Sequence, residues 1–376
     1  MGYQAINSMR KIIFIGFILM LVCLYSVPSQ AQSPIIDTGL VWLSSNQNFD
    51  GSWGDAVSAF VNTAEVINTL KALTANSQDY TEGINWLSTQ QGEITVDELS
   101  RKRIALNGDN GIGQLIPLLV SYRKDDGGWS LSPNHIVSDP LDTALALQAL
   151  KAINYSDQTV IQSAINYLLF TQNNDGGWGF YPSTCSGCDD GDESNVYMTA
   201  LVSMTLQQFP RTTSIATAIN KATSYLIAHQ NADGGFGGSP STVYETSLVY
   251  LALVSETTDA TVLGNAINHL TSTQLSNGSW DDDPYSTALA LRALAAVKPN
   301  LSISANDITF SNPTPIAGET ITISADVKNS GPAQADNISV QFYDGDTSAG
   351  GVLIGETTIS SIPSFGSSQT SINYTI

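Results

Sequence analysis

Apolar residues recur three and four positions apart in several similar segments between residues 58 and 298, which is the spacing of one helix face. Alanine and leucine dominate these segments, and both residues favour helix. Another apolar run precedes most of these segments. In it an aromatic residue or histidine stands directly before leucine, as in Tyr167-Leu168 and His269-Leu270. The pattern predicts helix pairs repeated along the chain, with a shared threonine in the second helix of each pair: Thr63, Thr143, Thr199, Thr246 and Thr287.

A glycine-rich turn separates the two helices of a pair. Its form is Gln-x-x-Asp/Asn-Gly-Gly/Ser-Trp/Phe, and the Asp-Gly or Asn-Gly step predicts a helix C-terminus that passes through the left-handed conformation. We interpret the repeated Gln amide and Trp ring as structural groups that join one repeat to the next by hydrogen bonding and stacking. Copies begin at Gln47, Arg123, Gln172, Gln230 and Gln274, and Gln91 marks a degenerate sixth.

This repeat resembles the QW repeat of the squalene-hopene and oxidosqualene cyclases and of the protein prenyltransferase β-subunits. The resemblance covers about residues 32–298. It implies a mainly α fold, an α/α toroid of about six helix pairs in which inner and outer helices surround a central cavity. In this frame, residues 35–46 and 81–90 are expected as outer helices and residues 58–75 as an inner helix.

The composition changes at Pro299, where short segments with an apolar residue at every second position predict strands separated by turns. Three phrases, residues 317–323, 327–331 and 337–343, resemble the CARDB module, an Ig-like domain of bacterial and archaeal surface proteins. We therefore expect residues 299–376 to form a CARDB-like all-β sandwich. The sandwich is expected to be incomplete, because a closing strand is missing from this stretch: either the protein continues, or another element pairs the open edge.

The N-terminal segment has the pattern of a signal peptide. Arg10 and Lys11 precede an apolar run, and the small residues up to Ala31 suit cleavage, so residues 1–31 are expected to be removed and the mature chain to lack a transmembrane span. The whole chain has a net charge of −20. Such acidity argues against nucleic acid and anionic membrane surfaces as partners. Together these features predict a secreted or cell-surface protein.

The resemblance suggests two kinds of chemistry, and the residues argue against both. In the squalene-hopene cyclases the middle aspartate of a D-x-D-D-T-A motif protonates the substrate, whereas residues 139–144 here place Leu141 at that position. An alkyl side chain cannot donate a proton. The frame recurs at Asp283, so Asp139 and Asp283 are interpreted as helix N-caps followed by proline. The Asp, Cys and His ligands of the prenyltransferase zinc are also missing, so no metal is predicted from that family and no catalytic residue is identified.

Two smaller clusters have modest interpretations. Cys185 and Cys188 lie in one loop, and in an exported protein a local disulfide is favoured over a metal-binding pair. Acidic residues 189–193 follow them, so calcium is possible there, although the spacing matches no EF-hand loop; no other cofactor is predicted. The basic run at residues 101–103 is interpreted as a solvated helix face that pairs with nearby carboxylates rather than as a phosphate site, because no glycine-rich loop accompanies it.

The candidate ligand site is the end of the toroid where the inner helices begin. If the repeats superpose, the positions one and two before the shared threonine meet around the cavity entrance. Tyrosines with carboxylates suit sugar rings or a cationic group. The alternative is that the tyrosines only mark the polar end of a packed helix. The predicted ligand-binding residues are Tyr197, Tyr244, Tyr285, Asp142 and Glu245.

Three functional hypotheses follow from the sequence. The first is an exported module whose toroid binds an unidentified ligand, a glycan or a small hydrophobic molecule, while the CARDB-like domain serves as a spacer or contacts a cell-surface partner. The second is a toroid enzyme, either terpene cyclase-like or polysaccharide lyase-like, that lacks the standard acid and zinc ligands. The third is a cobalamin carrier, which no particular residue supports. Fold resemblance alone does not choose between them.

Overall fold

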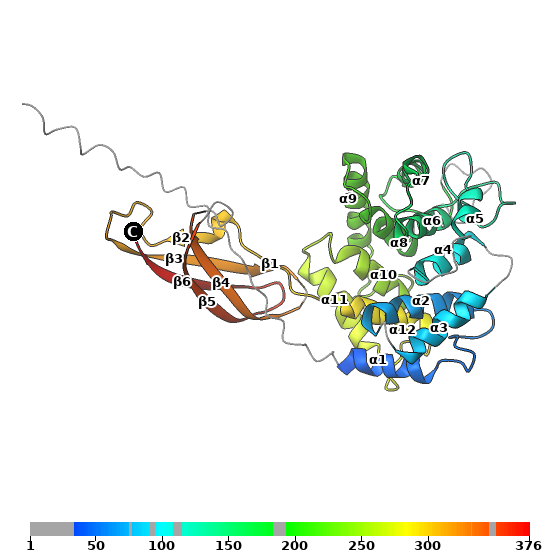
Figure 1. Ribbon diagram of the computed structural model, residues 1–376, viewed down its shortest axis with the longest axis horizontal. Coiled ribbons are helices and arrows are strands. Elements are labelled where there is room, and N and C mark those ends of the chain that lie inside the picture. The colour runs from blue at the N-terminus through cyan, green and yellow to red at the C-terminus, as the bar shows by residue number, and fades with distance from the viewer. Residues whose placement is uncertain are drawn as a thin grey trace, which may run out of the picture. The chain divides into compact units, whose positions relative to one another are not determined.

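A computed structural model describes residues 34–74, 77–90, 95–107, 115–182, 193–331, 333–345 and 351–376 (Figure 1). The chain divides into a helical unit that ends at Val297 and a strand unit that begins at Lys298. The predicted signal segment, Cys185 and Cys188 lie outside the described residues. In the part of the chain that is described, no helix has both the length and the apolar composition needed to span a bilayer.

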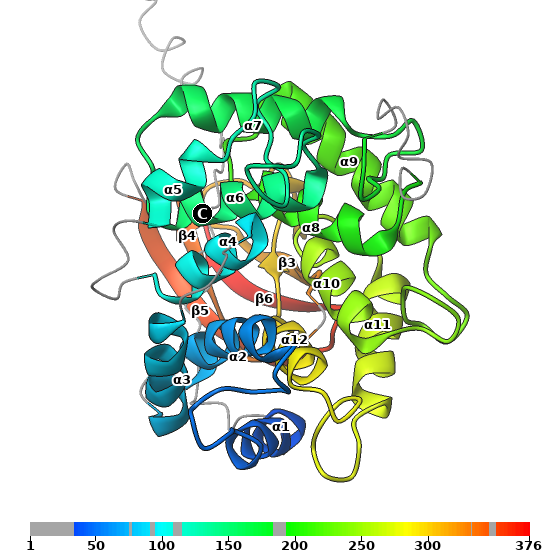
Figure 2. The same cartoon turned by 90° about the vertical axis from the view of Figure 1, so that its right-hand side faces the viewer.

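The inner helices of the helical unit form a closed ring. Each packs against the next in chain order, and the last packs against the first (Figure 2). These helices are α2 (Ala59–Leu73), α4 (Val96–Ala105), α6 (Pro140–Ala152), α8 (Val196–Gln207), α10 (Val243–Leu253) and α12 (Pro284–Ala295). All of them except the charged helix α4 are apolar on most sides, because they are covered both by their neighbours in the ring and by the outer helices.

An outer helix precedes each inner helix and packs on the outside of the ring (Figure 2). The two sets alternate along the chain, so the predicted α/α toroid of six helix pairs is confirmed. The outer helices bury one face and leave the other to solvent. They are α1 (Pro34–Ser45), α3 (Gln78–Thr89), α5 (Leu115–Ser121), α7 (Gln158–Phe170), α9 (Thr213–Ala228) and α11 (Ala260–Ser272).

The repeated glutamines join neighbouring outer helices, as predicted. The side-chain amide of Gln172 donates to the carbonyl of Gly176 in its own turn and to that of Ala218 in α9, both at 2.9 Å. Equivalent bonds run from Gln47 and Gln230 to the next outer helix. Gln274 donates to the carbonyl of Ile35 in α1 and so closes the ring.

The repeated tryptophans join repeats through their rings, as predicted, while their hydrogen bonds stay within their own repeat. Trp53 Nε1 donates to the carbonyl of Leu43 at 2.7 Å, in the preceding outer helix. The fully buried ring packs against Gly83 of the next outer helix α3, where an added Cβ would lie 2.8 Å from the ring. The indole therefore joins repeats by packing alone, and its polar atom anchors the turn.

The glycine-rich turn is a separate unit rather than a helix C-terminus, so that detail of the prediction was wrong. Helix α7 ends at Phe170, whereas the glycine with positive φ, Gly176, follows six residues later at φ 95°. Asp175 Oδ1 accepts hydrogen bonds from the backbone N of Gly177 and the hydroxyl of Ser194. The turn thus holds the segment that leads into α8.

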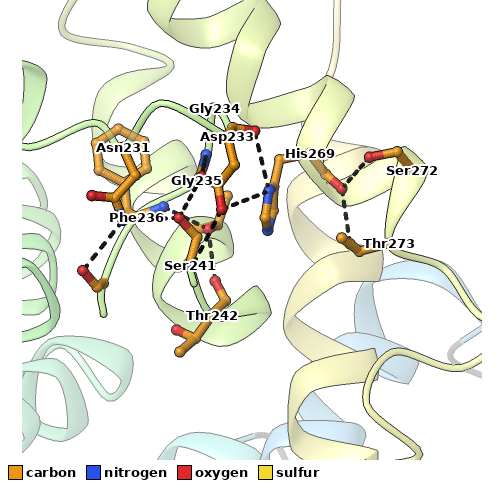
Figure 3. Close-up of polar contacts among 12 residues, drawn as sticks. Asn231, Asp233, Gly234, Gly235, Phe236, Ser241, Thr242, His269, Ser272 and Thr273 are labelled. Atoms are coloured by element: carbon orange, nitrogen blue, oxygen red, sulfur yellow. Dashed lines mark hydrogen bonds and ion pairs between the residues drawn. The ribbon is translucent and has the colours of Figure 1, made fainter. Parts of the chain in front are cut away.

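The aromatic position of the outer helices contacts the preceding repeat. The hydroxyls of Tyr167 and Tyr225 donate to the carbonyls of Ser138 and Ser194, at 2.5 and 2.8 Å. His269 occupies this position in α11, and its Nδ1 lies 3.4 Å from the carbonyl of Asp233 and 4.0 Å from the Asp233 carboxylate (Figure 3). Its Nε2 is buried and has no hydrogen-bond partner in the described residues. His269 thus takes the place that tyrosine has in α7 and α9.

The strand unit is a two-sheet sandwich. Strand β3 (Thr320–Asn329) pairs antiparallel with β1 (Leu301–Ser302), β2 (Ile308–Phe310) and β6 (Ser367–Thr375). The second sheet contains β4 (Ala335–Asp344) and β5 (Val352–Ile362), and in the described residues β4 pairs only with β5. Alternate residues of β3 and β4 face a shared core, which includes Ile323 and Phe342. The predicted C-terminal all-β domain is therefore confirmed.

Candidate functional site

Three of the predicted ligand residues lie together where the inner helices begin. Tyr197, Tyr244 and Tyr285 are each the second residue of their helix, α8, α10 and α12. The ring centroids of Tyr197 and Tyr244 are 6.1 Å apart in an edge-to-face arrangement, and those of Tyr244 and Tyr285 are 6.4 Å apart. All three side chains are partly buried. We call these residues the tyrosine cluster.

The two predicted carboxylates differ in their relation to the tyrosine cluster. Burial raises the pKa of Tyr244, and Glu245 lies close enough to raise that pKa further, whereas Asp142 is on α6, which carries no tyrosine of the cluster. Asp142 and Glu245 are each the third residue of their helix, roughly 100° around the helix from the second. Glu245 Oε2 accepts a hydrogen bond from the hydroxyl of Thr242, the N-cap of its own helix, at 2.7 Å. Asp142 faces its own N-cap, Asp139. Both carboxylates therefore contact their own helix ends, and that of Glu245 also lies beside Tyr244.

Asp139 and Asp142 form a buried acidic pair. Asp139 caps α6 by accepting from the backbone N of Asp142 at 2.8 Å, and Asp283 caps α12 in the same way, as predicted. Burial, and then the facing carboxylate of Asp142, raise the pKa of Asp139 to about 9, while burial raises the pKa of Asp142 to about 6. The pair therefore retains a proton at neutral pH. Asp142 Oδ1 is buried and has no hydrogen-bond partner in the part of the chain that is described.

The basic run at residues 101–103 is not a solvated face, which corrects the sequence interpretation, although the expected pairing with a carboxylate is present between Arg101 and Asp97. Helix α4 is an inner helix, and the Arg101 side chain is only 11% exposed, with its Nε donating to Asp97 one turn earlier. Lys102 is buried and donates to the carbonyls of Ser88 and Gln90. Charged groups this deep remain charged only with such partners.

Arg101 extends from the ring wall toward the tyrosine cluster. Burial lowers its pKa, but the nearby Asp97, Tyr285, Tyr197 and Glu65 raise that pKa well above its ordinary value. Because α8 and α12 lie across the ring from α4, a group close to tyrosines on both helices lies near the ring axis (Figure 2). The structure thus adds a guanidinium to the site.

Sequence reasoning missed Arg101, although a signal was present. Thr95 and Glu98 form a capping box, so Asp97 takes the same second helical position as the clustered tyrosines. The T-x-x-E pattern is visible in the sequence and marks a helix start. Because the turn before it is degenerate, this helix was not aligned with the other inner helices.

A separate polar cavity lies outside the inner ring. It has a volume of about 580 Å³ and is lined by the turn at Gln172 to Asp175 and by Tyr225 and His229 of the α9 end. The rings of Tyr225 and His229 stack with centroids 4.0 Å apart. In the described ranges no group of three or more His, Cys, Asp or Glu residues is arranged to hold a metal ion. The predicted calcium and disulfide concern a loop outside those ranges and stay predictions.

Comparison with known families identifies both units. Residues 66–279 match the model of the prenyltransferase alpha-alpha toroid domain, and residues 298–376 match the CARDB model. Over 194 residues the chain is 30% identical to a drimenyl diphosphate synthase of Streptomyces showdoensis, which covers 47% of this chain and 34% of that enzyme. A squalene–hopene cyclase of Bradyrhizobium diazoefficiens is 28% identical over 153 residues, 40% of this chain and 20% of that enzyme. The chain thus spans about a third or less of the length of these relatives.

Solved structures share the toroid fold at low identity. The type II terpene cyclase MstE from Scytonema, in complex with geranylgeranyl dihydroxybenzoate, superposes with a TM-score of 0.55 at 15% identity, covering 70% of this chain and 96% of that one. The GH76A alpha-1,6-mannanase from Salegentibacter superposes with a TM-score of 0.53 at 11% identity, covering 70% of this chain and 97% of that one. One fold therefore accompanies both isoprenoid and glycan chemistry.

Proposed function

Because this chain belongs to the prenyltransferase alpha-alpha toroid domain family, we propose that its toroid retains the family's ring of inner helices but uses it as a binding module for a sugar. The observation that carries this proposal is the tyrosine cluster. Three partly buried tyrosine side chains, one each from α8, α10 and α12, lie together where these inner helices begin. Tyrosine combines an apolar face with a hydroxyl, and both match the surfaces of a sugar.

The groups around the cluster favour a polar ligand. The guanidinium of Arg101 lies near Tyr197 and Tyr285, and its described hydrogen bond uses only Nε. Its terminal nitrogens can donate hydrogen bonds to the hydroxyl oxygens of a sugar. At the position of the cyclase acid stands Leu141, which has no proton to give. Family membership establishes the fold, whereas the function has to be inferred from the residues of the site.

The remaining parts of the proposal concern location. The predicted signal segment and the CARDB domain support export, with the toroid acting outside the cell and the CARDB domain as a spacer or a contact for a surface partner. A net charge of −20 keeps such a protein soluble and repels anionic surfaces. Extraction of the mature protein from the culture medium or the cell surface of the producing organism tests this location, and retention in the cytoplasm contradicts it.

Isothermal titration calorimetry with defined neutral oligosaccharides of glucose, mannose, xylose and N-acetylglucosamine tests the binding. We expect one class to bind, and Tyr244→Ala to weaken it at least about tenfold because the ring contact is lost. Tyr181→Ala is the matched control, since Tyr181 is an exposed tyrosine outside the cluster. Loss of binding in His229→Ala with normal binding in Tyr244→Ala would move the ligand to the polar cavity and overturn the proposal.

A second candidate function has its own observation. The buried Asp139–Asp142 pair retains a proton at neutral pH, and a squalene–hopene cyclase is among the relatives. In such a reaction the carboxylic acid would protonate an alkene carbon, the cation would close a ring, and loss of a proton would restore the acid. Incubation with squalene, farnesyl diphosphate and geranylgeranyl diphosphate tests it by mass spectrometry. Cyclised product from the wild type, absent with Asp142→Asn, would favour this enzyme over the binding module.

A further inference from the structure

The axis-facing residues of the inner helices form three layers. Residues four and seven positions after the clustered tyrosines lie on the same helix face, since an α-helix has 3.6 residues per turn. The first layer, with the tyrosine cluster, and the third, with Gln148 and Arg292, are partly buried. The second layer is the most buried of the three and consists of Glu65, Arg101, Leu145, Leu201, Leu248 and Leu289.

Burial in the second layer means that side chains fill the ring at that depth. Glu65 is 7% exposed, and each of the four leucines is at least as buried. The side chain of Arg101, 11% exposed, is the least buried member. A ligand that enters at the tyrosine cluster is therefore blocked one helical turn further in by the side chains of the second layer, which form the floor of the site.

Two ion pairs cross this floor. Arg292 of the third layer pairs with Glu65 of the second, from neighbouring helices α12 and α2. Arg101 of the second layer pairs with Asp97 of the first. The other four positions of the second layer are leucine, so the charges are confined to one side of an otherwise apolar layer. We call Glu65, Asp97, Arg101 and Arg292 the charged belt.

We infer that the charged belt is a specificity element, which excludes isoprenoid chains from the ring axis and offers hydrogen-bond donors to a polar ligand above it. The second half of this inference rests on the proposed function, and the first half does not. An isoprenoid chain has no acceptor along its length, so its insertion would remove water from the two ion pairs of the belt and would offer no hydrogen bond in return. A sugar end placed over the belt accepts hydrogen bonds from the terminal nitrogens of Arg101, for which no protein acceptor is found in the described residues.

The test replaces the belt by the residues that the ring itself uses elsewhere. The four-site variant Glu65→Leu, Asp97→Leu, Arg101→Leu and Arg292→Leu makes the second layer wholly apolar. Replacing both partners of a buried ion pair by apolar residues is often neutral or stabilising, so the fold is expected to persist. Farnesol and geranylgeraniol are the probes, with retention measured by native mass spectrometry and affinity by quenching of intrinsic fluorescence. Arg101→Met alone, which keeps the length of the side chain, is the second variant should the four-site protein fail to fold.

We expect the wild type to retain neither alcohol and the four-site variant to bind farnesol at least about tenfold more tightly, with Arg101→Met intermediate. Farnesol bound equally well by wild type and variants, or by none of the folded proteins, would overturn the inference. The sugar titrations distinguish the two proposals. A wild type that excludes farnesol, admits it after belt replacement and binds no sugar would leave the exclusion standing and remove the proposed function.

Discussion

The side-chain amide of Gln274 donates a hydrogen bond to the main-chain carbonyl of Ile35 at 2.9 Å, across 239 positions of the chain. This bond lies between the last outer helix, α11, and the first, α1, so it fastens the two ends of the helical array. The same amide also donates to the carbonyl of Gly278 at 2.9 Å, which holds the adjacent turn. Ring closure thus uses the same chemistry as the joints between sequential repeats.

Replacing Gln274 is therefore expected to loosen the ring. Gln274→Ala removes one donor from each of two carbonyl oxygens, and we expect it to lower the free energy of unfolding by about 1 to 3 kcal/mol. Gln162→Ala is the control, because Gln162 is exposed and its side chain bonds, among the described residues, only to Asn166 in its own helix. Urea denaturation followed by circular dichroism measures both. Equal stability of the two variants would show that closure does not depend on this amide.

Two helical glycines are expected to respond to alanine with opposite signs. At Gly83 an added Cβ would lie 2.8 Å from the ring of Trp53 and 3.2 Å from Ile67 Cγ1, and the buried indole has no room to move. Gly83→Ala should therefore destabilise the protein by about 1 to 3 kcal/mol through overpacking. At Gly264 in α11 nothing lies within 4 Å of the added atom. Gly264→Ala should stabilise it by about 0.5 to 1 kcal/mol.

Thermal denaturation of these two glycine variants beside the wild type provides the comparison. A stabilised or neutral Gly83→Ala protein would contradict the close packing of Trp53 on the next repeat. A destabilised Gly264→Ala protein would show that α11 has a neighbour at that face.

The Asp139–Asp142 pair predicts that the protein loses stability as the pH rises. The pKa of each carboxyl in the folded state, about 9 and about 6, lies above its ordinary value of 3.8. Their contribution is therefore full below about pH 4 and is lost as the pH rises through the two folded-state values. Asp142→Asn removes the ionising group and its repulsion of Asp139. We expect this variant to match the wild type near pH 4 and to exceed its stability at pH 8 by about 1 to 3 kcal/mol.

Urea titrations at a series of pH values measure this difference. Asp157→Asn provides the control, because Asp157 is an exposed N-cap of α7 and asparagine caps equally well. A difference between wild type and Asp142→Asn that stays constant with pH would mean that the pair does not hold the proton assigned to it.

His269 predicts a gain from restoring the residue found in α7 and α9. In those helices a tyrosine hydroxyl donates to the carbonyl of a serine in the preceding repeat. That serine stands directly before the N-cap of the preceding inner helix. The corresponding serine for His269 is Ser241, just before the N-cap Thr242 (Figure 3). His269→Tyr should supply that bond and remove the unpartnered Nε2, raising stability by about 0.5 to 1.5 kcal/mol. His269→Phe lacks the hydroxyl and should gain less; a larger gain for phenylalanine would exclude the hydrogen bond as the cause.

The sequence by itself determined the repeat and therefore the ring. The spacing of apolar residues depends on helix geometry alone, and a unit repeated about six times with its joining glutamines leaves little choice of architecture. The caps at Asp139 and Asp283 were predicted for the same reason, because an N-cap depends on residues within one turn of helix. The tyrosine cluster also followed from repeat alignment, since equivalent positions of superposed repeats meet around one axis.

Only the tertiary structure decided which polar groups share that axis. Asp142 and Glu245 differ from the tyrosines by one position, and that single step brings their side chains to their own helix caps, where Glu245 also stays close to Tyr244. Arg101 belongs to the repeat whose turn is degenerate, so the sequence pattern does not assign it to the inner ring. The packing of α4 between α2 and α6 places it there. The burial and pairing of a charge depend on neighbours that are distant in sequence, and local patterns do not encode them.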